Sequence, residues 1–198
     1  MATGFQDRMK GKTFSSSGCV QQFGGGSAFS GGGGNIFIYA NATGTNPGTG
    51  GVDTVLAVYS LPAKSLDIVN RVLQFYAAGS VVSNANAKDI KIIWNPSTAV
   101  VGSTVGSGGT VVADTGSFTT VSSGTGWQLN AQIVKLAAAN TQLGLHVGAQ
   151  VGGTSLPLVA PTSLSATESG NILIAVTGNT VTSAANIVCN YFEVCALN

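Results

Sequence analysis

Charged residues are scarce in this 198-residue chain. Asp, Glu, Lys and Arg make up 8% of it, against about 25% in an average soluble domain. The eight bases and seven acids leave a formal net charge of +1, so the chain as a whole is not biased toward nucleic acid or an anionic membrane. Such sparse charge, with 28 glycines, predicts an exterior largely in contact with other proteins. An ordinary sandwich with a hydroxyl-rich exterior is the alternative.

Long apolar runs are also missing. No segment approaches the roughly 18–20 apolar residues that span a bilayer. The N-terminus has no apolar stretch after its first charges, so no secretory signal is evident and synthesis in a cytoplasm is expected. Cys189 and Cys195 lie six residues apart in a predicted strand, roughly 20 Å when extended, whereas a disulfide needs Cα atoms within roughly 7 Å. With Cys19 in the N-terminal segment, free thiols are expected.

Residues with catalytic or metal-binding chemistry are few and scattered. The only histidine is His146, and no G-x-S-x-G motif marks a nucleophilic serine. The seven acids show no local pairing of the kind a glycosidase needs, although folding can bring distant acids together. No cluster of His, Cys, Asp or Glu suggests a metal site, and the glycine regions at 34, 44 and 48–51 are not followed by Lys-Ser or Lys-Thr, as a phosphate loop would be. The sequence therefore predicts no enzyme, cofactor or metal.

The segment from Val52 to Trp94 has the clearest strand pattern. Three strand-like runs cover residues 52–60, 69–79 and 88–94, and residues of opposite faces alternate in the second and third; in the second run Leu73, Phe75 and Ala77 share one face. This period of two predicts half-buried strands of an antiparallel sheet. Pro62 cannot donate to a ladder and ends the first strand, and residues 83–87 are predicted to form an Asn/Ala turn.

The rest of the chain also alternates in short runs separated by Gly, Asn and Pro. No window has a convincing helical period, and the prolines in 154–166 argue against a central strand there. The pattern predicts an all-β body, an antiparallel β-sandwich or jelly roll, over residues 35–198. Further strands are predicted at 35–40, 98–105, 110–113, 117–121, 127–136, 142–151, 171–177 and 187–197, with a turn at 178–180. Alternation is expected to place Leu143, Leu145, Val147 and Ala149 on one side of the strand 142–151, and Val188, Phe192, Val194 and Ala196 on one side of the strand 187–197.

Residues 1–34 are predicted to form an extended, Gly-rich N-terminal arm. They have no periodicity and end in G-G-G-S-A-F-S-G-G-G-G, yet they contain four phenylalanines and three of the eight bases. A plain linker does not need aromatic rings, whereas an arm that docks on a partner can place each ring in a pocket. Packing of the arm along its own domain is the alternative. The candidate docking residues are Phe5, Arg8, Lys10, Lys12, Phe14, Phe23 and Phe29.

Several short motifs resemble a known module. They are L-P-A at 61–63, R-V-L-Q-F-Y-A-A-G at 71–79 and N-A-N-A-K-D-I-K-I at 84–92. In this order they resemble a module found repeatedly in virion proteins of tailed bacteriophages. The stretches 126–131 through 140–142 and 172–178 through 183–186 extend the likeness to roughly residues 52–197. The resemblance implies a jelly roll, usually trimeric, on the particle surface, and none of its motifs is catalytic.

These observations together favour a structural virion protein. We expect a homotrimeric capsid decoration (cement) protein on the capsid exterior, made in the bacterial host and contacting the major capsid protein and possible neighbouring decoration or fibre proteins. No membrane is expected as a partner, and three bases in the arm are too few to predict nucleic acid. The main alternative is a receptor- or glycan-binding head- or tail-fibre module. A major shell component is a third, for which the chain is short.

Overall fold

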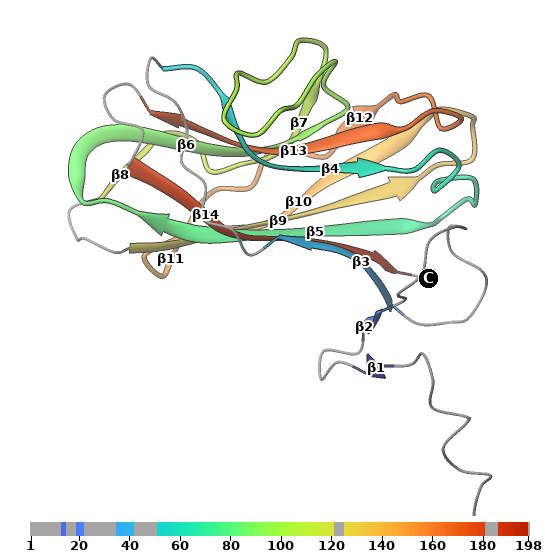
Figure 1. Cartoon of the computed structure of the whole chain (residues 1–198), viewed down its shortest axis with the longest axis horizontal. Coiled ribbons are helices and arrows are strands. Elements are labelled where there is room, and N and C mark those ends of the chain that lie inside the picture. Colours follow the sequence, from blue (N-terminus) through green and yellow to red (C-terminus); the bar gives the residue numbers. More distant parts are fainter. Residues whose placement is uncertain are drawn as a thin grey trace, which may run out of the picture.

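The computed structural model describes residues 13–14, 19–21, 35–41, 51–120, 125–180 and 186–197. Within these ranges the protein is all-β, without an α-helix, and two sheets lie face to face (Figure 1). The all-β prediction is therefore confirmed. The strands are β1 (Thr13–Phe14), β2 (Cys19–Gln21), β3 (Asn35–Asn41), β4 (Thr54–Leu61), β5 (Val72–Val81), β6 (Asn84–Trp94), β7 (Thr110–Asp114), β8 (Phe118–Thr120), β9 (Thr125–Lys135), β10 (Gln142–Val151), β11 (Thr154–Ser155), β12 (Thr162–Leu164), β13 (Ile172–Thr180) and β14 (Ile187–Leu197).

The two sheets differ in size. The nine-stranded sheet has the order β1-β2-β3-β14-β5-β9-β10-β11, and β12 also pairs with β10. The five-stranded sheet has the order β4-β13-β6-β7, and β8 also pairs with β6. The paired strands are antiparallel, as predicted, with the exception of β2 and β3, which run parallel. Most neighbours in the sheets are distant in sequence, so the fold depends on long-range pairing.

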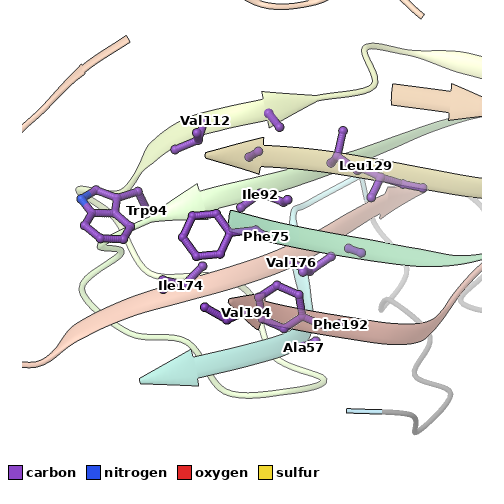
Figure 2. Close-up of a cluster of buried hydrophobic side chains, with 14 of the residues drawn as sticks. Ala57, Phe75, Ile92, Trp94, Val112, Leu129, Ile174, Val176, Phe192 and Val194 are labelled. Atoms are coloured by element: carbon purple, nitrogen blue, oxygen red, sulfur yellow. The ribbon is translucent and has the colours of Figure 1, made fainter. Parts of the chain in front are cut away.

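The core forms where the alternating apolar residues of both sheets meet. Leu73, Phe75 and Ala77 of β5 are fully buried, while the residues between them are only half-buried, as the alternation predicted. Phe75 reaches across to Trp94 of β6, with ring centroids 6.4 Å apart (Figure 2). Complete burial of a large apolar side chain stabilises the fold by about 1.5–3 kcal/mol, so this central layer is a major source of stability.

One contact in the core depends on a glycine. The Trp127 indole of β9 passes over Gly79 of β5 and donates from Nε1 to the carbonyl of Val188, at 3.1 Å. A Cβ at position 79 would lie 1.8 Å from that carbonyl oxygen and 2.8 Å from the indole nitrogen. Glycine is therefore the residue that fits beneath this indole, which links β9 to β14 across β5.

Three local predictions were wrong. Residues 84–87, predicted as a turn, already belong to β6, and residues 178–180 continue β13 along β6. The segment 98–105, predicted as a short strand, is a loop with one isolated bridge, between Thr104 and Thr54. Asn and Gly favour turns in isolation, but here residues 178–180 pair with β6, and Asn84 pairs with Thr120 of β8. This pairing satisfies backbone groups and prevails over the local preference.

Two bulges change which residues face the core. In β10 the register shifts between His146 and Gly148, so Ala149 lies in the core. The prediction that Ala149 shares one face with Leu143 and Leu145 was therefore wrong. In β14 the register shifts between Cys189 and Tyr191. Cys189 consequently lies in the core with Phe192, and the predicted alignment of Val188 with that face was wrong. A bulge inserts one residue and reverses the alternation beyond it.

The loop between β6 and β7 lies over the outer face of the five-stranded sheet (Figure 1). Val55 of β4 donates its N–H to Ser103 O at 2.9 Å and accepts from Gly102 N at 2.9 Å. This cover explains why Ile93 is buried although its β6 neighbours Ile92 and Trp94 point into the core. The tip of the loop remains in solvent.

Candidate functional site

The outer face of the nine-stranded sheet is broad and almost without charge. It consists of the outward-pointing residues of β14, β5, β9 and β10, which alternate with core residues and are half-buried. Five of its polar side chains are carboxamides, and its single ionisable acid or base is Glu193. We call this surface the amide face; its polar members are Gln74, Tyr76, Gln128, Asn130, Gln132, Gln150, Tyr191 and Glu193.

Part of the amide face is a hydrogen-bonded row across three strands. The Tyr76 hydroxyl donates to Gln128 Oε1 at 3.3 Å, and Gln128 Nε2 donates to Gln150 Oε1 at 2.8 Å. The Tyr76 ring also lies against Tyr191 of β14, with centroids 6.1 Å apart. These contacts order the side chains before any partner binds, which reduces the conformational entropy that binding must overcome.

The one acid of the amide face is already engaged. Glu193 accepts from the Tyr191 hydroxyl at 2.6 Å and from the Cys195 thiol at 2.9 Å, one donor for each carboxylate oxygen. Hydrogen bonds to a carboxylate spread its charge over neighbouring groups. The face as a whole therefore has little electrostatic preference for a charged ligand.

An aliphatic row lies at one end of the amide face. Register places Leu197 opposite Val72, Val72 opposite Val134, and Val134 opposite Leu143, so these four side chains run across all four central strands. All are half-buried. Carboxamides beside an apolar row form the mixed, uncharged composition that occurs at the centres of protein contacts.

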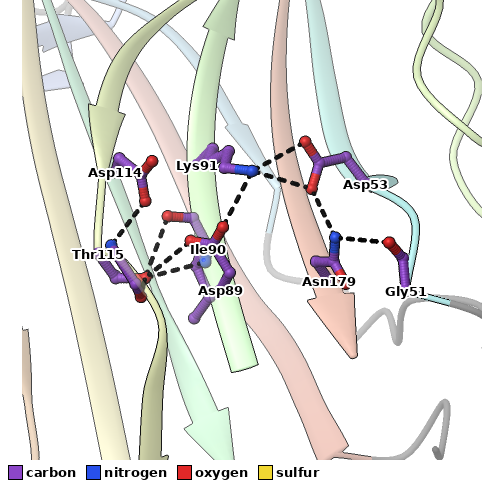
Figure 3. A network of polar contacts seen from close by, with 9 residues as sticks. Gly51, Asp53, Asp89, Ile90, Lys91, Asp114, Thr115 and Asn179 are labelled. Atoms are coloured by element: carbon purple, nitrogen blue, oxygen red, sulfur yellow. Dashed lines mark hydrogen bonds and ion pairs between the residues drawn. The ribbon is translucent and has the colours of Figure 1, made fainter. Parts of the chain in front are cut away.

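The outer face of the five-stranded sheet has the opposite character. Lys91 Nζ lies 3.1 Å from Asp53 Oδ2 and 2.9 Å from Asp89 Oδ2 (Figure 3). Asn179 Nδ2 donates to Asp53 Oδ1 at 3.2 Å, and Thr115 links Asp89 to the backbone of β6. Folding thus brings Asp53 and Asp114, both distant in sequence, to Asp89 and Lys91 of β6, a grouping that local spacing in the sequence could not reveal.

The charges of this network affect one another. Burial, followed by a hydrogen bond with Asp114, raises the pKa of Asp89, and the nearby Lys91 only partly opposes this. Burial lowers the pKa of Lys91, but the hydrogen bonds to Asp89 and Asp53 outweigh it and leave that pKa raised. Two acids that share a hydrogen bond favour one shared proton. The network stabilises the surface of this sheet.

A second candidate site is an open groove at one end of the sandwich, with a volume of about 480 Å³. It lies between the loops 62–71, 136–141 and 165–171. We call it the end groove. Ion-pairing and hydrogen-bonding side chains, including Lys64, Asp67 and Asn140, lie beside an aliphatic wall of Val69, Ala137 and Ala139.

Glu168 joins the three loops beneath the end groove. Its Oε1 accepts from Lys135 Nζ at 2.9 Å and from Gln142 Nε2 at 2.6 Å, and its Oε2 accepts from Asn140 N at 3.2 Å. Its backbone N–H donates to Asn140 Oδ1 at 3.0 Å, and its carbonyl accepts from Lys64 N at 2.7 Å. Burial alone would raise the pKa of Glu168, but the hydrogen bonds from Lys135, Gln142 and Asn140 outweigh burial and lower it.

The predicted docking residues of the arm cannot be placed. Phe5, Arg8, Lys10, Lys12, Phe23 and Phe29 lie outside the described residues, and of Phe14 only the backbone is described, in β1. Between residues 13 and 41 the described backbone is strand: β1 pairs with β2, and β2 with β3 at the edge of the nine-stranded sheet.

The remaining sequence predictions concern single residues. His146 is buried, and its Nδ1 accepts from Val159 N at 2.9 Å, while burial lowers its pKa. Cys189 and Cys195 are buried and neither forms a disulfide, as expected. Across residues 51–120, 125–180 and 186–197, no three His, Cys, Asp or Glu side chains are arranged to hold a metal. The described part of the chain contains no helix with the length and apolar character needed to cross a bilayer.

The amide face was not recognised from the sequence, although a signal was present. Gln128, Asn130 and Gln132 occupy alternate positions between core residues in W-Q-L-N-A-Q-I. Three carboxamides at every second position predict a strand with one uncharged polar face. In the sheet, Gln74 of β5 and Gln150 of β10 lie opposite two of them. No family model, curated protein or solved structure matches the chain.

Proposed function

We propose that this chain is a structural virion protein of a tailed bacteriophage, a homotrimeric decoration protein that stabilises the major capsid shell. The observation that carries the proposal is the contrast between the two outer sheet faces. One bears Asp53, Asp89, Lys91 and Asp114, whereas the amide face has Glu193 as its one charged residue. Charged residues are depleted at the centres of protein contacts, so an uncharged sheet face is suited to permanent cover by a neighbour.

The resemblance of residues 52–197 to a phage virion module supports the same function. On this proposal the two sheets form a jelly roll, and the arm of residues 1–34 docks on the capsid. A threefold arrangement presents three arms from one particle, and their simultaneous docking multiplies weak individual contacts. The protein then stabilises the shell by adding buried area across junctions between capsid subunits, and neighbouring decoration or fibre proteins are further partners on the capsid exterior.

Two measurements test this function. Quantitative mass spectrometry of virions of the phage that encodes this chain should find hundreds of copies in each particle. A few copies, or a few dozen, would instead place the chain in a fibre or a tail. A chain without residues 1–34 should remain a folded trimer but no longer sediment with capsid shells. Binding as strong as that of the full chain would refute the role of the arm.

The end groove supports a second candidate function, a receptor- or glycan-binding fibre module. Its hydrogen-bonding side chains stand beside an aliphatic wall on a frame held by Glu168, and sugars require donors, acceptors and apolar contact together. This function predicts binding of the chain to host cell-surface polysaccharide, lost in Asn140→Ala and Lys64→Ala variants. Decoration predicts no such binding, so one pull-down with purified polysaccharide separates the two functions.

A further inference from the structure

The amide face is more specific than a generally apolar surface, because the polar side chains on it that have no hydrogen-bond partner within the described residues are mostly carboxamides. Tyr76, Gln128 and Gln150 bond to one another, whereas Gln74 and Gln132 have no side-chain hydrogen bond within the described residues. These two stand directly opposite each other on β5 and β9, the inner two of the four strands, next to Val72 and Val134 of the aliphatic row. Each carboxamide presents two N–H donors and one acceptor oxygen.

We propose that the amide face is the surface through which copies of this chain contact one another, and that the trimer turns it toward its threefold axis. This inference rests on the proposed function, which supplies the trimer. It adds which of the two sheets faces the other copies. The occupant of the face is thus a second copy of this chain.

The chemistry of the face favours an identical partner. A carboxamide satisfies the donors and acceptors of another carboxamide, so copies of one uncharged amide surface can satisfy each other without any complementary charge. A different protein is usually selected by opposite charge across the contact, and Glu193, the one charge available here, already accepts two intramolecular hydrogen bonds. A nucleic acid or an acidic protein would require bases, which the four central strands lack on this face.

The size of the face is also adequate. Four strands about 4.8 Å apart and about ten residues long cover roughly 600 Å² of flat area. A standard stable contact buries about 800 Å² on each partner, and protruding side chains raise the accessible area above the flat value. The aliphatic row of Val72, Val134, Leu143 and Leu197 supplies apolar area at one end.

The outer face of the other sheet is a poor choice for the same contact. Lys91 and the acids around it would have to leave water, which is costly even for paired charges. The loop between β6 and β7 also covers part of this face and makes it uneven. The two faces therefore differ in charge and in flatness, and both differences favour the amide face as the internal one.

Charge placed on the amide face tests the inference. The variants Gln132→Glu and Gln74→Glu should each reduce the solution mass, measured by light scattering after size exclusion, from three chains to one. The matched control is Ser60→Glu, since Ser60 is exposed on β4 of the other sheet. This control should remain a trimer. A trimer of unchanged mass in both amide-face variants, or a monomeric wild-type protein, would overturn the inference.

Cross-linking covers the case in which a glutamate variant fails to fold. In a Cys19→Ser background, Gln132→Cys should give cross-linked pairs with a short bismaleimide, and Ser60→Cys should give none. Cys189 and Cys195 are buried and stay silent. Equal cross-linking at both positions, or none at Gln132, contradicts the inference. If the expected pattern holds but the trimer does not bind capsid shells, the inference stands and the decoration function fails.

Discussion

Lys135 and Glu168 form a buried ion pair, with Nζ and Oε1 2.9 Å apart and side chains 4% and 12% exposed. Lys135 ends strand β9, whereas Glu168 lies in the loop between β12 and β13, and the lysine also donates to Ala138 O at 2.6 Å. Because Gln142 and Asn140 supply the other donors to the carboxylate, the charges are compensated by hydrogen bonds as well as by each other. The pair therefore holds one end of the sandwich together.

Glu168→Gln should destabilise the protein by about 3–5 kcal/mol, because it leaves the Lys135 ammonium buried without its counter-charge. The measurement is the free energy of unfolding from chemical denaturation. The double variant Lys135→Met with Glu168→Leu is the matched control. It removes both charges, and it should be more stable than Glu168→Gln alone. An equal decrease in the free energy of unfolding in the two proteins would show that lost packing, and not the unpaired charge, causes the destabilisation.

The pH dependence of stability should contain two opposite contributions. The pKa of Glu168 is lowered by folding, so its contribution is present above the pKa of the unfolded chain and is lost as the pH falls through the folded value. The pKa of Asp89 is raised by folding, so its contribution is present at low pH and is lost as the pH rises through the folded value.

Asp89→Asn isolates the second contribution. In the wild-type protein, ionisation of Asp89 should lower the free energy of unfolding as the pH rises above about 4. Asparagine resembles the protonated acid at every pH, so this decrease should be absent from the variant. Thermal denaturation at a series of pH values measures this slope. A slope identical to that of the wild-type protein would show that Asp89 does not share a proton with Asp114.

Gly79→Ala should destabilise the protein by more than about 3 kcal/mol or prevent folding, because the new Cβ would overlap Val188 O. Trp127→Phe should cost about 1–3 kcal/mol through loss of the indole donor to the same carbonyl. Gly126→Ala on β9 is the matched control, since its Cβ would have 3.8 Å to the nearest atom. Its stability should stay within about 0.5 kcal/mol of the wild type. Chemical denaturation of the three proteins makes the comparison, and a tolerated Gly79→Ala would contradict the described contact.

The Cys189 thiol should be unreactive in the folded protein. Burial raises its pKa to about 12, and the thiolate is the reactive form. In a Cys19→Ser, Cys195→Ser variant, a thiol-specific colour reagent at pH 8 should detect no thiol before denaturation and one thiol after it. Fast labelling of the native protein would show that the inner side of β14 opens to solvent.

Much of the fold could be predicted because alternation is a local property. Leu73, Phe75 and Ala77 are buried as their spacing predicted, and the run 187–197 is strand β14 with the predicted bounds. The bulges next to His146 and Cys189 were not predicted, because an inserted residue appears in the sequence only as one more residue of the same strand. Each bulge reversed the facing of the residues beyond it.

The candidate sites depended on pairing between distant segments, which the sequence does not show. Glu168 and Lys135 are far apart in the chain, as are Asp53 and Lys91, and only the register of the sheets brings them together. The amide face could be predicted only in part. The alternating carboxamides of β9 are visible in the sequence, but the position of Gln74 beside them follows only from the pairing of β5 with β9. Local pattern therefore predicted the strands, and long-range topology determined the surfaces.

The central claim is that the chain is a trimeric virion protein, and its most direct test is an electron cryo-microscopy reconstruction of the virion in which the proposed function places the chain. The account predicts threefold clusters of this chain on the outside of the head, with the amide faces toward each axis and the Asp53–Lys91 network toward solvent. A chain found as single copies, or trimers with the charged face at the axis and the amide face in water, would contradict it.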